Sequence, residues 1–333
     1  MKPIKSNIEF CIGIDISKAD FHAALLRTKD KKVLAQKTFA NNAAGFKNLH
    51  KWLIGKTSAS LPVHICMEAT GSYGEDVAFF FHDKVTRLSV VNPRAIKAHG
   101  DSFLRRCKSD PADARLIADF CLQKQPSQWI APTPGQQKIK ALSRRLTALK
   151  KSLNQESNRL KTTSDKEVVK DIKEHLRWIS NHINKLEGKL VTLVKEDKTT
   201  GQQHALITSI PGFGDKTAAH LLAEIGDVSI YSNARQLAAH AGVTPSIFET
   251  GTSSKKRTPM TKAGNAHMRK MLFFPAMTAM LHNPICKAFA DRLNEKGKPK
   301  IVIIGAVMNK LLHLVFGVLK NQQPFNPNLL RNP

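Results

Sequence analysis

Four acidic residues in the first part of the chain have the types and spacing of a divalent-metal site. Asp15 ends one apolar run in G-I-D-I-S-K, and Glu68 ends another in C-M-E-A-T-G. Asp110 and Asp113 are three residues apart in K-S-D-P-A-D-A-R, so on a helix both side chains point the same way. Carboxylates are the ligands that Mg²⁺ and Mn²⁺ prefer. Two such ions can activate an attacking oxygen and stabilise a leaving one, which predicts phosphodiester chemistry at these residues.

Each carboxylate also has a purely structural interpretation. Asp110 and Glu68 can each cap a helix. Asp113 can pair with Arg106 or Arg115. A carboxylate after a hydrophobic strand is nevertheless costly unless it is paired or metal-bound, and neighbouring like charges oppose ionisation unless a cation shares them. The order of a strand-end Asp, a strand-end Glu and a helical Asp pair therefore favours a shared cation.

The elements that must position these residues alternate between strands and helices. Short apolar runs between turns predict strands, and apolar residues at 3,4 spacing predict helices. Three consecutive strands followed by alternating helices and strands indicate an α/β domain with a mixed sheet over residues 8–128. The predicted strands are 10–16, 21–26, 33–39, 63–67 and 88–91, and the predicted helices are 42–53, one from 71 onward and 110–121.

The periodicity changes in the middle of the chain. From Gln137 onward, leucines and isoleucines keep a 3,4 spacing through two long segments, which predicts two long helices. They form either an antiparallel hairpin or an oligomerisation coiled coil. The two prolines within residues 129–134 predict a linker. Residues 129–200 are therefore expected to be a linker followed by coiled-coil helices.

The last region, residues 201–326, is predicted to be mostly α-helical and to contain a helix-hairpin-helix motif. Its I-P-G-F-G-D-K-T-A segment places Gly212 and Gly214 in a tight turn, for which glycine permits positive φ. Backbone N–H groups at the start of the next helix, with Lys216, can then face a phosphate. A plain packing turn is the alternative.

The charge of the chain predicts a nucleic-acid partner. Among 333 residues, 52 Lys and Arg oppose 26 Asp and Glu, a formal net charge of +26. Such an excess is tolerated mainly where an anionic partner neutralises it. No acidic residue lies between Glu249 and Asp291, which indicates a phosphate contact there. The candidate nucleic-acid-binding residues are Arg94, Lys97, Arg105, Arg106, Lys108, Gly212, Gly214, Lys216, Lys255, Lys256, Arg257, Lys262 and Arg269.

The cysteines and apolar segments point to a reducing cytoplasm, with the protein at the nucleoid when it acts. Five cysteines lie far apart with no C-x-x-C pair, which argues against a zinc site and a disulfide framework. Asp15 interrupts the first apolar run, so no signal peptide is expected. Residues 301–319 contain Asn309, Lys310 and His313, and are therefore predicted to be an amphipathic helix and not a membrane span.

Together these motifs resemble the DEDD transposases of the insertion-sequence 110 family. The resemblance runs from about Phe10 to about Phe325, and Piv-type DNA invertases share the same build. It rests on G-I-D-I-S-K, I-C-M-E-A-T-G-S-Y, V-N-P-R-A-I-K, K-S-D-P-A-D-A-R, I-P-G-F-G-D-K-T-A and A-G-V-T-P, in the family's order and spacing.

The resemblance implies more than the pattern does. It implies an RNase H-like (RuvC-like) N-terminal domain whose tetrad, Asp15, Glu68, Asp110 and Asp113, binds Mg²⁺. It implies a coiled-coil dimerisation segment over residues 137–195 and assembly into dimers or tetramers. It also implies a C-terminal serine that attacks DNA and becomes covalently linked to it, and guidance by a structured RNA encoded beside the transposase.

One position departs from the family pattern. Where the family usually has Ser-Gly, this chain reads E-T-G-T-S-S, so Thr250 stands at the expected serine. Threonine keeps a nucleophilic hydroxyl, but its methyl group restricts χ1 and crowds attack. Three interpretations remain open: Thr250 attacks, Ser253 or Ser254 takes over, or this copy is impaired.

Other functions make different predictions. A metal-dependent nuclease, such as a junction resolvase, would cut without joining and would not need Thr250. An actin-like sugar kinase or ATPase shares the G-I-D start but needs a second glycine-rich phosphate loop, which is not found after residue 100. A binding protein without activity predicts that Asp15→Asn changes neither metal affinity nor cleavage.

Overall fold

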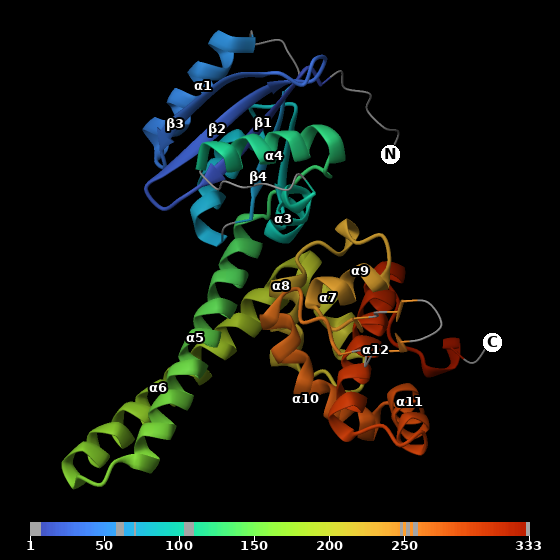
Figure 1. Ribbon diagram of the computed structural model, residues 1–333. Coiled ribbons are helices and arrows are strands. Elements are labelled where there is room, and N and C mark those ends of the chain that lie inside the picture. Colours follow the sequence, from blue (N-terminus) through green and yellow to red (C-terminus); the bar gives the residue numbers. More distant parts are fainter. Residues whose placement is uncertain are drawn as a thin grey trace. The chain divides into compact units, whose positions relative to one another are not determined.

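The computed structural model divides the chain into two compact units, Met1–Ala131 and Pro132–Pro333, which are described separately (Figure 1). The residues that the structure describes are 8–57, 63–69, 71–102, 110–246, 249–250, 254–255 and 259–330.

The first unit is built on a five-stranded sheet in the order β3-β2-β1-β4-β5. The first three strands form an antiparallel meander, whereas β4 and β5 join β1 in parallel. The sequence-based prediction of a mixed sheet is confirmed. The strands are β1 (Phe10–Ile16), β2 (Asp20–Arg27), β3 (Val33–Ala40), β4 (Val63–Glu68) and β5 (Arg87–Val91).

The two faces of this sheet have different contents because successive side chains point in opposite directions. One face carries Ile12, Ile14 and Ile65, which pack with residues of α1 and α2 in a large apolar cluster. The other face is crossed by α4 and carries smaller side chains (Figure 1). The helical elements of this unit are α1 (Ala43–Thr57), η1 (Gly71–Gly74), α2 (Glu75–His82), α3 (Pro93–Asp101) and α4 (Asp110–Lys124).

Two features of the first unit differ from the sequence-based expectation. Helix α3 is not among the predicted elements, although Pro93 occupies its first turn and Asn92 caps it by accepting a hydrogen bond from Arg94 N at 2.9 Å. Trp129, expected in a linker, is part of the unit instead. Its backbone N–H donates to Leu88 O at 2.7 Å, and its ring lies 5.2 Å from that of Phe79.

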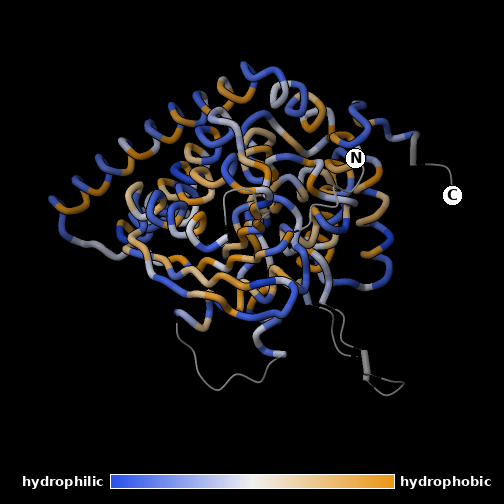
Figure 2. Tube along the Cα trace, turned by 90° about the horizontal axis from the view of Figure 1, so that it is seen from above, coloured by the Kyte–Doolittle hydropathy of each residue, from blue (hydrophilic) through white to orange (hydrophobic). Residues whose placement is uncertain are grey.

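The second unit begins with a hairpin of two long helices, α5 (Pro134–Thr162) and α6 (Lys166–Glu196) (Figure 1). Thr133 and Gln136 form a capping box at the start of α5, and Asp165 caps α6. Hydrophobic and hydrophilic residues alternate along the long helices in Figure 2, as expected for helices with one apolar stripe. Buried residues of both helices, such as Leu146 and Leu190, join one cluster with the rest of the unit.

The remainder of this unit is mostly helical, as predicted. Its apolar core centres on α12, whose buried residues pack with those of α7 to α11. The elements are α7 (Lys198–Thr208), α8 (Asp215–Ile225), η2 (Val228–Ile230), α9 (Ala234–Ala241), β6 (Glu249–Thr250), β7 (Ser254–Lys255), α10 (Ala266–His282), α11 (Pro284–Glu295), α12 (Lys300–Asn321) and η3 (Pro327–Leu330).

Helix α12 is the one described helix long and apolar enough to cross a membrane by length and composition. Its side chains Val307, Leu311 and Val315 are fully buried in the core of the unit. Burial in a protein core accounts for the apolar composition of this helix without a bilayer.

Candidate active site

Strands β1 and β4 place two of the predicted carboxylates side by side. The strands are parallel, and Ile14 pairs with Met67, so the next residues, Asp15 and Glu68, are neighbours at the carboxyl ends of both strands. Both are half-buried. Their positions in the pleat put them on the face that α4 crosses, opposite to the face of Ile14 and Met67.

Gly13 determines how closely α4 approaches this face. A Cβ atom at Gly13 would lie 2.1 Å from Ala114 O and 2.3 Å from Ala118 N, both on the α4 backbone. Only glycine permits this approach. Because Asp110 and Asp113 are on the first turn of α4, the close contact at Ala114 holds both aspartates beside the end of β1.

The electrostatics of Asp15 reflect this convergence. Burial raises the pKa of the Asp15 carboxyl above its ordinary value of 3.8, and the charges of Asp113 and Asp110 raise it further. The nearby His22 opposes this shift. Like charges of Asp15, Asp110 and Asp113 therefore act on one another at this end of the sheet. These three residues and Glu68 are called the tetrad below.

Removing the charge of Asp15 is expected to stabilise the metal-free protein at neutral pH. A carboxyl whose pKa is raised by folding binds its proton more tightly in the folded state, so stability falls as the pH rises from 3.8 through the folded pKa. Asp15→Asn should therefore melt at a higher temperature than the wild type at pH 7 in EDTA. Calorimetry should show that the difference shrinks as the pH approaches 4, and a lower melting temperature for the variant at pH 7 would contradict this account.

His22 is a site residue that the sequence analysis missed. It is the Cα partner of Asp15 across the β1–β2 pair, and its Nε2 lies 3.6 Å from Asp110 Oδ2. Its Nδ1 is hydrogen-bonded to Thr38 Oγ1 at 2.8 Å, which fixes the ring. The antiparallel register of the first two predicted strands was the signal that could have identified it.

The four tetrad residues, all of which the structure describes, come from neighbouring elements, but no three of their carboxylates have oxygens within 4.8 Å of one another. Within the described ranges, the one group of three or more potential ligand atoms that lie within 4.8 Å of one another consists of Cys11, His64 and Cys121. Shared metal binding by the tetrad therefore requires the carboxylates to turn toward one another from the backbone positions given above.

The predicted nucleophiles belong to the second unit. Strands β6 and β7 form a small antiparallel hairpin in which Thr250 and Ser254 are Cα partners. Ser253 lies outside the described residues. The backbone therefore brings two of the three candidate hydroxyl-bearing residues to opposite positions of one hairpin.

Comparison with known proteins identifies the family of the chain. A DEDD transposase model of the IS110 type matches residues 12–167, and a model described as "Transposase IS116/IS110/IS902 family" matches residues 204–291. The chain belongs to this transposase family. It is accordingly a DNA transposase or recombinase.

The relatives of this transposase include inverting proteins as well as insertion elements. It is 31% identical to the pilin gene-inverting protein of Moraxella bovis over 319 residues, which cover 96% of this chain and 98% of that protein. It is 22% identical over 295 residues to the transposase of insertion sequence element IS1328 from Yersinia enterocolitica, covering 78% and 81% of the two chains. A 43.6 kDa protein of IS110 from Streptomyces coelicolor is 29% identical over 117 residues, 35% of this chain and 28% of that one.

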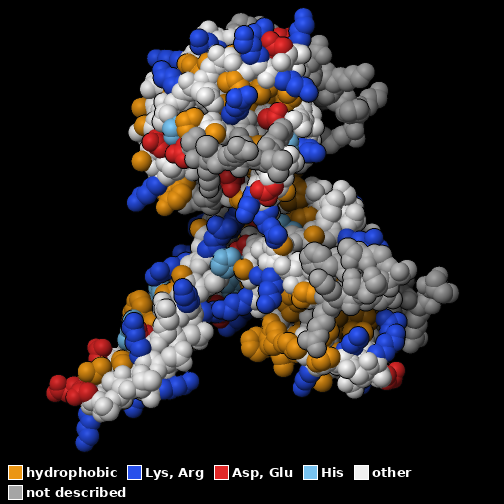
Figure 3. All heavy atoms as spheres, in the orientation of Figure 1, with side chains coloured by type: hydrophobic (Ala, Val, Ile, Leu, Met, Phe, Trp, Pro, Cys, Tyr) orange, Lys and Arg blue, Asp and Glu red, His pale blue; other side chains and the backbone are white. Residues whose placement is uncertain are grey.

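The basic residues predicted to bind nucleic acid occupy several parts of the transposase. On the face shown in Figure 3, Lys and Arg side chains outnumber Asp and Glu over both units. Arg94 and Lys97 are exposed on α3, and Lys262 is exposed before α10. Arg269 is half-buried and donates a hydrogen bond to Ala241 O at 3.1 Å. Arg105, Arg106, Lys108, Lys256 and Arg257 lie outside the described residues, and Lys255 is described only as part of β7.

The turn between α7 and α8 contains the predicted glycines in different environments. Gly212 has a φ of +120°, and a Cβ there would lie 2.9 Å from Ala279 Cβ and 3.0 Å from Pro275 O of α10. Gly214, the N-cap of α8, faces open space. Lys216 Nζ lies 2.6 Å from Glu187 Oε2. The turn is thus packed against α10 on the Gly212 side and open at the start of α8.

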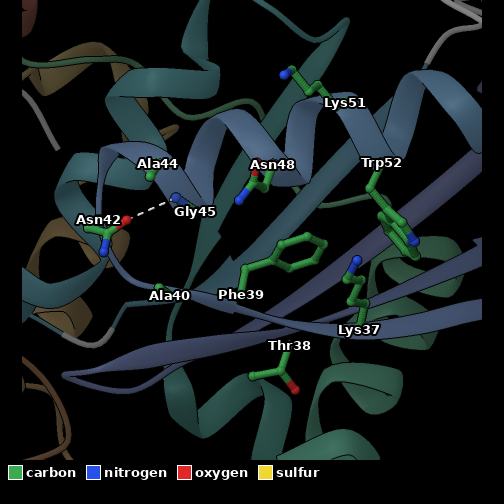
Figure 4. Close-up of a pocket in the computed structure, with 10 residues that line it drawn as sticks. All are labelled: Lys37, Thr38, Phe39, Ala40, Asn42, Ala44, Gly45, Asn48, Lys51 and Trp52. Carbon is green, nitrogen blue, oxygen red and sulfur yellow. Dashed lines mark hydrogen bonds between the residues drawn. The ribbon is translucent and has the colours of Figure 1, made fainter.

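A cavity of about 690 Å³ lies between β3 and α1, away from the tetrad (Figure 4). Its lining includes the cations Lys37 and Lys51 and the ring of Trp52, and no acidic residue. Asn42, which also lines it, accepts a hydrogen bond from Gly45 N at 2.9 Å and so caps α1. Because the lining has two lysines and no carboxylate, a divalent cation is disfavoured in this cavity.

Proposed function

We propose that this transposase cuts and rejoins DNA strands, with the tetrad holding Mg²⁺ or Mn²⁺ and a hydroxyl of the β6–β7 hairpin as nucleophile. The observation that carries the proposal is the close contact between the α4 backbone and Gly13. This contact holds Asp110 and Asp113 beside Asp15 at the strand ends, where burial raises the pKa of Asp15 and the charges of Asp113 and Asp110 raise it further. Oxygen ligands from four carboxylates suit a hard divalent cation.

The proposal also includes an RNase H-like first domain, a coiled coil between protomers and a helix-hairpin-helix motif. The mixed sheet with a strand-end Asp and a helical Asp pair supports an RNase H-like, RuvC-like domain. The apolar stripes of α5 and α6 support a role as a coiled coil between protomers, in a dimer or tetramer. The open Gly214 end of α8 supports a helix-hairpin-helix that faces a DNA phosphate.

Each site residue has a part in the proposed chemistry. Metal ions bound by the tetrad would supply Lewis-acid activation of the phosphodiester. Asp15 and Glu68, on rigid strand ends, would set the position of the site, and Asp110 and Asp113 would close it from α4. His22, held by Thr38, would orient the Asp110 carboxylate and limit its movement.

Thr250 is the proposed nucleophile. It stands where the family has serine, and its Cα partner Ser254 is the nearest alternative on the same hairpin. Attack by the hydroxyl oxygen on phosphorus forms a phosphoester with the protein and breaks the bond to the leaving 3′ or 5′ oxygen, which takes up a proton. The resemblance to the family further supports a structured guide RNA that pairs with target and donor DNA.

The nucleophile is tested by trapping the covalent product. Full-length protein would be incubated in Mg²⁺ with RNA transcribed from the DNA that flanks its gene and with labelled DNA that matches this RNA. A protease-sensitive protein–DNA adduct is expected for the wild type and should fall at least about 100-fold in Thr250→Ala, which has no hydroxyl. Thr250→Ser should restore or exceed wild-type yield because it removes the crowding methyl group.

Control variants separate the alternatives in this experiment. Ser254→Ala and Ser253→Ala should leave the adduct near the wild-type level. An adduct that survives in Thr250→Ala but is lost in Ser254→Ala would assign the attack to Ser254. Free cleaved ends without any adduct or joined product would replace the proposal by a metal-dependent nuclease.

Site-specific inversion of a DNA segment is the second candidate, favoured by the 31% identity to the Moraxella bovis pilin gene-inverting protein over nearly the whole chain. A plasmid with two inverted copies of the element's end distinguishes the two functions. Inversion of the segment between the copies supports an invertase, whereas excision and joining at a new target support a transposase.

A further inference from the structure

A second set of potential metal ligands occupies the same face of the sheet as the tetrad. Alternate residues of β1 on this face are Cys11, Gly13 and Asp15, and those of β4 are His64, Cys66 and Glu68. The carboxylates stand at the ends of the two rows. The Cys11 thiol and the His64 imidazole stand at the beginnings of the rows, and Cys66 is level with Gly13, where α4 makes its close contact.

Helix α4 completes this second set. Cys11 and His64 are Cα partners on neighbouring strands, and Cys121 reaches them from the last part of α4. One ligand atom from each residue lies within 4.8 Å of the other two, and all three residues are fully buried. Cys66, also fully buried, is beside the Cys121 thiol.

The hydrogen bonds around His64 determine which of its nitrogens carries a lone pair. Ser89 Oγ lies 2.7 Å from Ser127 O and 3.1 Å from Pro126 O, and carbonyls only accept, so the hydroxyl hydrogen of Ser89 is used there. Ser89 Oγ must then accept from His64 Nε2–H, which lies 2.8 Å away. This bond leaves Nδ1 unprotonated in the neutral ring.

His64 Nδ1 consequently carries a buried lone pair that accepts no hydrogen bond from the described residues. It has no hydrogen-bond partner among the residues that the structure describes, although the ring is fully buried. A buried polar atom that stays unsatisfied destabilises the folded state.

We propose that Cys11, His64 Nδ1 and Cys121 bind a structural Zn²⁺ ion, with Cys66 as the fourth ligand. A tetrahedral Cys₃His set is a common structural zinc site, with Zn–S near 2.3 Å and Zn–N near 2.1 Å. The Nε2–H bond to Ser89 supplies the outer hydrogen bond that orients a metal-binding histidine. Soft thiolates select zinc, whereas the tetrad selects a hard cation, so the two sites do not compete.

The role of this ion would be to hold the late part of α4 on β1 and β4. Asp110 and Asp113 are at the other end of the same helix, so a metal at Cys121 and the glycine contact at Gly13 would together fix its axis. Each thiol that binds releases its proton to solvent, so binding strengthens as the pH rises. The wide sequence spacing of these cysteines does not exclude the site, because its ligands come from three separate elements.

Metal content tests the proposal directly. Full-length protein made in zinc-supplemented medium and dialysed should contain about one zinc per chain by mass spectrometry. Cys11→Ser and Cys121→Ser should reduce this to less than about one tenth, while Cys286→Ser, a buried cysteine of the second unit, should leave it unchanged. Asp15→Asn should also keep the zinc, which separates this site from the tetrad.

A spectroscopic test on the wild-type protein does not depend on whether the cysteine variants fold. The protein would be freed of metal under reducing conditions, checked for native circular dichroism and titrated with Co²⁺. An intense thiolate-to-cobalt charge-transfer band that zinc abolishes is the expected result. Folded wild-type protein that contains no zinc and shows no such band with Co²⁺ would overturn the proposal, whatever its DNA cleavage activity.

Discussion

Asp15→Asn is expected to lower the rate of Mg²⁺-dependent strand cleavage by about 1,000-fold or more, a loss of about 4 kcal/mol of transition-state stabilisation. Asp15 is on a rigid strand end beside Glu68, and its pKa is raised by burial and by the nearby charges of Asp113 and Asp110. The amide keeps the shape of the side chain but removes the charge that attracts the cation. Single-turnover cleavage of a labelled duplex measures the effect.

A matched control distinguishes loss of the metal site from loss of a surface charge. Asp83→Asn removes one carboxylate from the same unit, where its side chain is 87% exposed after α2. This variant should cleave at the wild-type rate, and both variants should bind DNA with wild-type affinity in EDTA. Cleavage by Asp15→Asn within tenfold of the wild type, with an unchanged Mg²⁺ requirement, would remove the tetrad as the catalytic site.

Gly13→Ala is expected to have the second largest effect, on stability and on activity together. The new methyl group would be placed 2.1 Å from Ala114 O and 2.3 Å from Ala118 N, so α4 must move outward. Overpacking of this kind typically costs about 1–3 kcal/mol of unfolding free energy. Displacement of Asp110 and Asp113 by about 1 Å should in addition lower cleavage by about 100-fold. Urea unfolding and single-turnover cleavage measure the two effects.

Gly55→Ala provides the comparison for this substitution. Gly55 is on α1 of the same unit, and a Cβ there meets no atom within 4 Å. Alanine should stabilise the helix by about 0.5–1 kcal/mol and leave cleavage unchanged. If Gly13→Ala has the same effects on stability and cleavage as Gly55→Ala, the contact between α4 and Gly13 does not position the aspartates.

Much of the first unit follows from local sequence patterns. The apolar runs that predict residues 10–16 and 63–67 form β1 and β4 almost residue for residue. The predicted helix 110–121 forms most of α4, with Pro111 in its first turn. Asn265 is a local signal of the same kind, because it caps α10 by accepting a hydrogen bond from His267 N at 2.9 Å. These signals are visible in one sequence because turns, caps and hydrophobic periodicity depend on neighbours in the chain.

The parts that escaped prediction depend on contacts between distant segments. Gly13 has the ordinary appearance of a glycine in a strand, and only the position of α4 explains it. His22 enters the site through strand register and not through a motif. Cys11, His64 and Cys121 lie so far apart in the sequence that no spacing rule connects them. Hydrophobic patterns specify which face of a strand is buried, but not which polar side chains meet across two strands and a helix.

The strict alternation along β1 limits how this region can change in evolution. Insertion of one residue in β1 before Ile14 would turn Ile14 toward α4 and would turn the Asp15 carboxylate into the aromatic cluster around Phe21 and Phe46. Insertions and deletions should therefore accumulate in the hairpin tip between β2 and β3, where Asp30 and Lys31 are exposed, and not within the strands. In a library of single-codon insertions, functional survivors should be absent from residues 10–16 and common at residues 29–32.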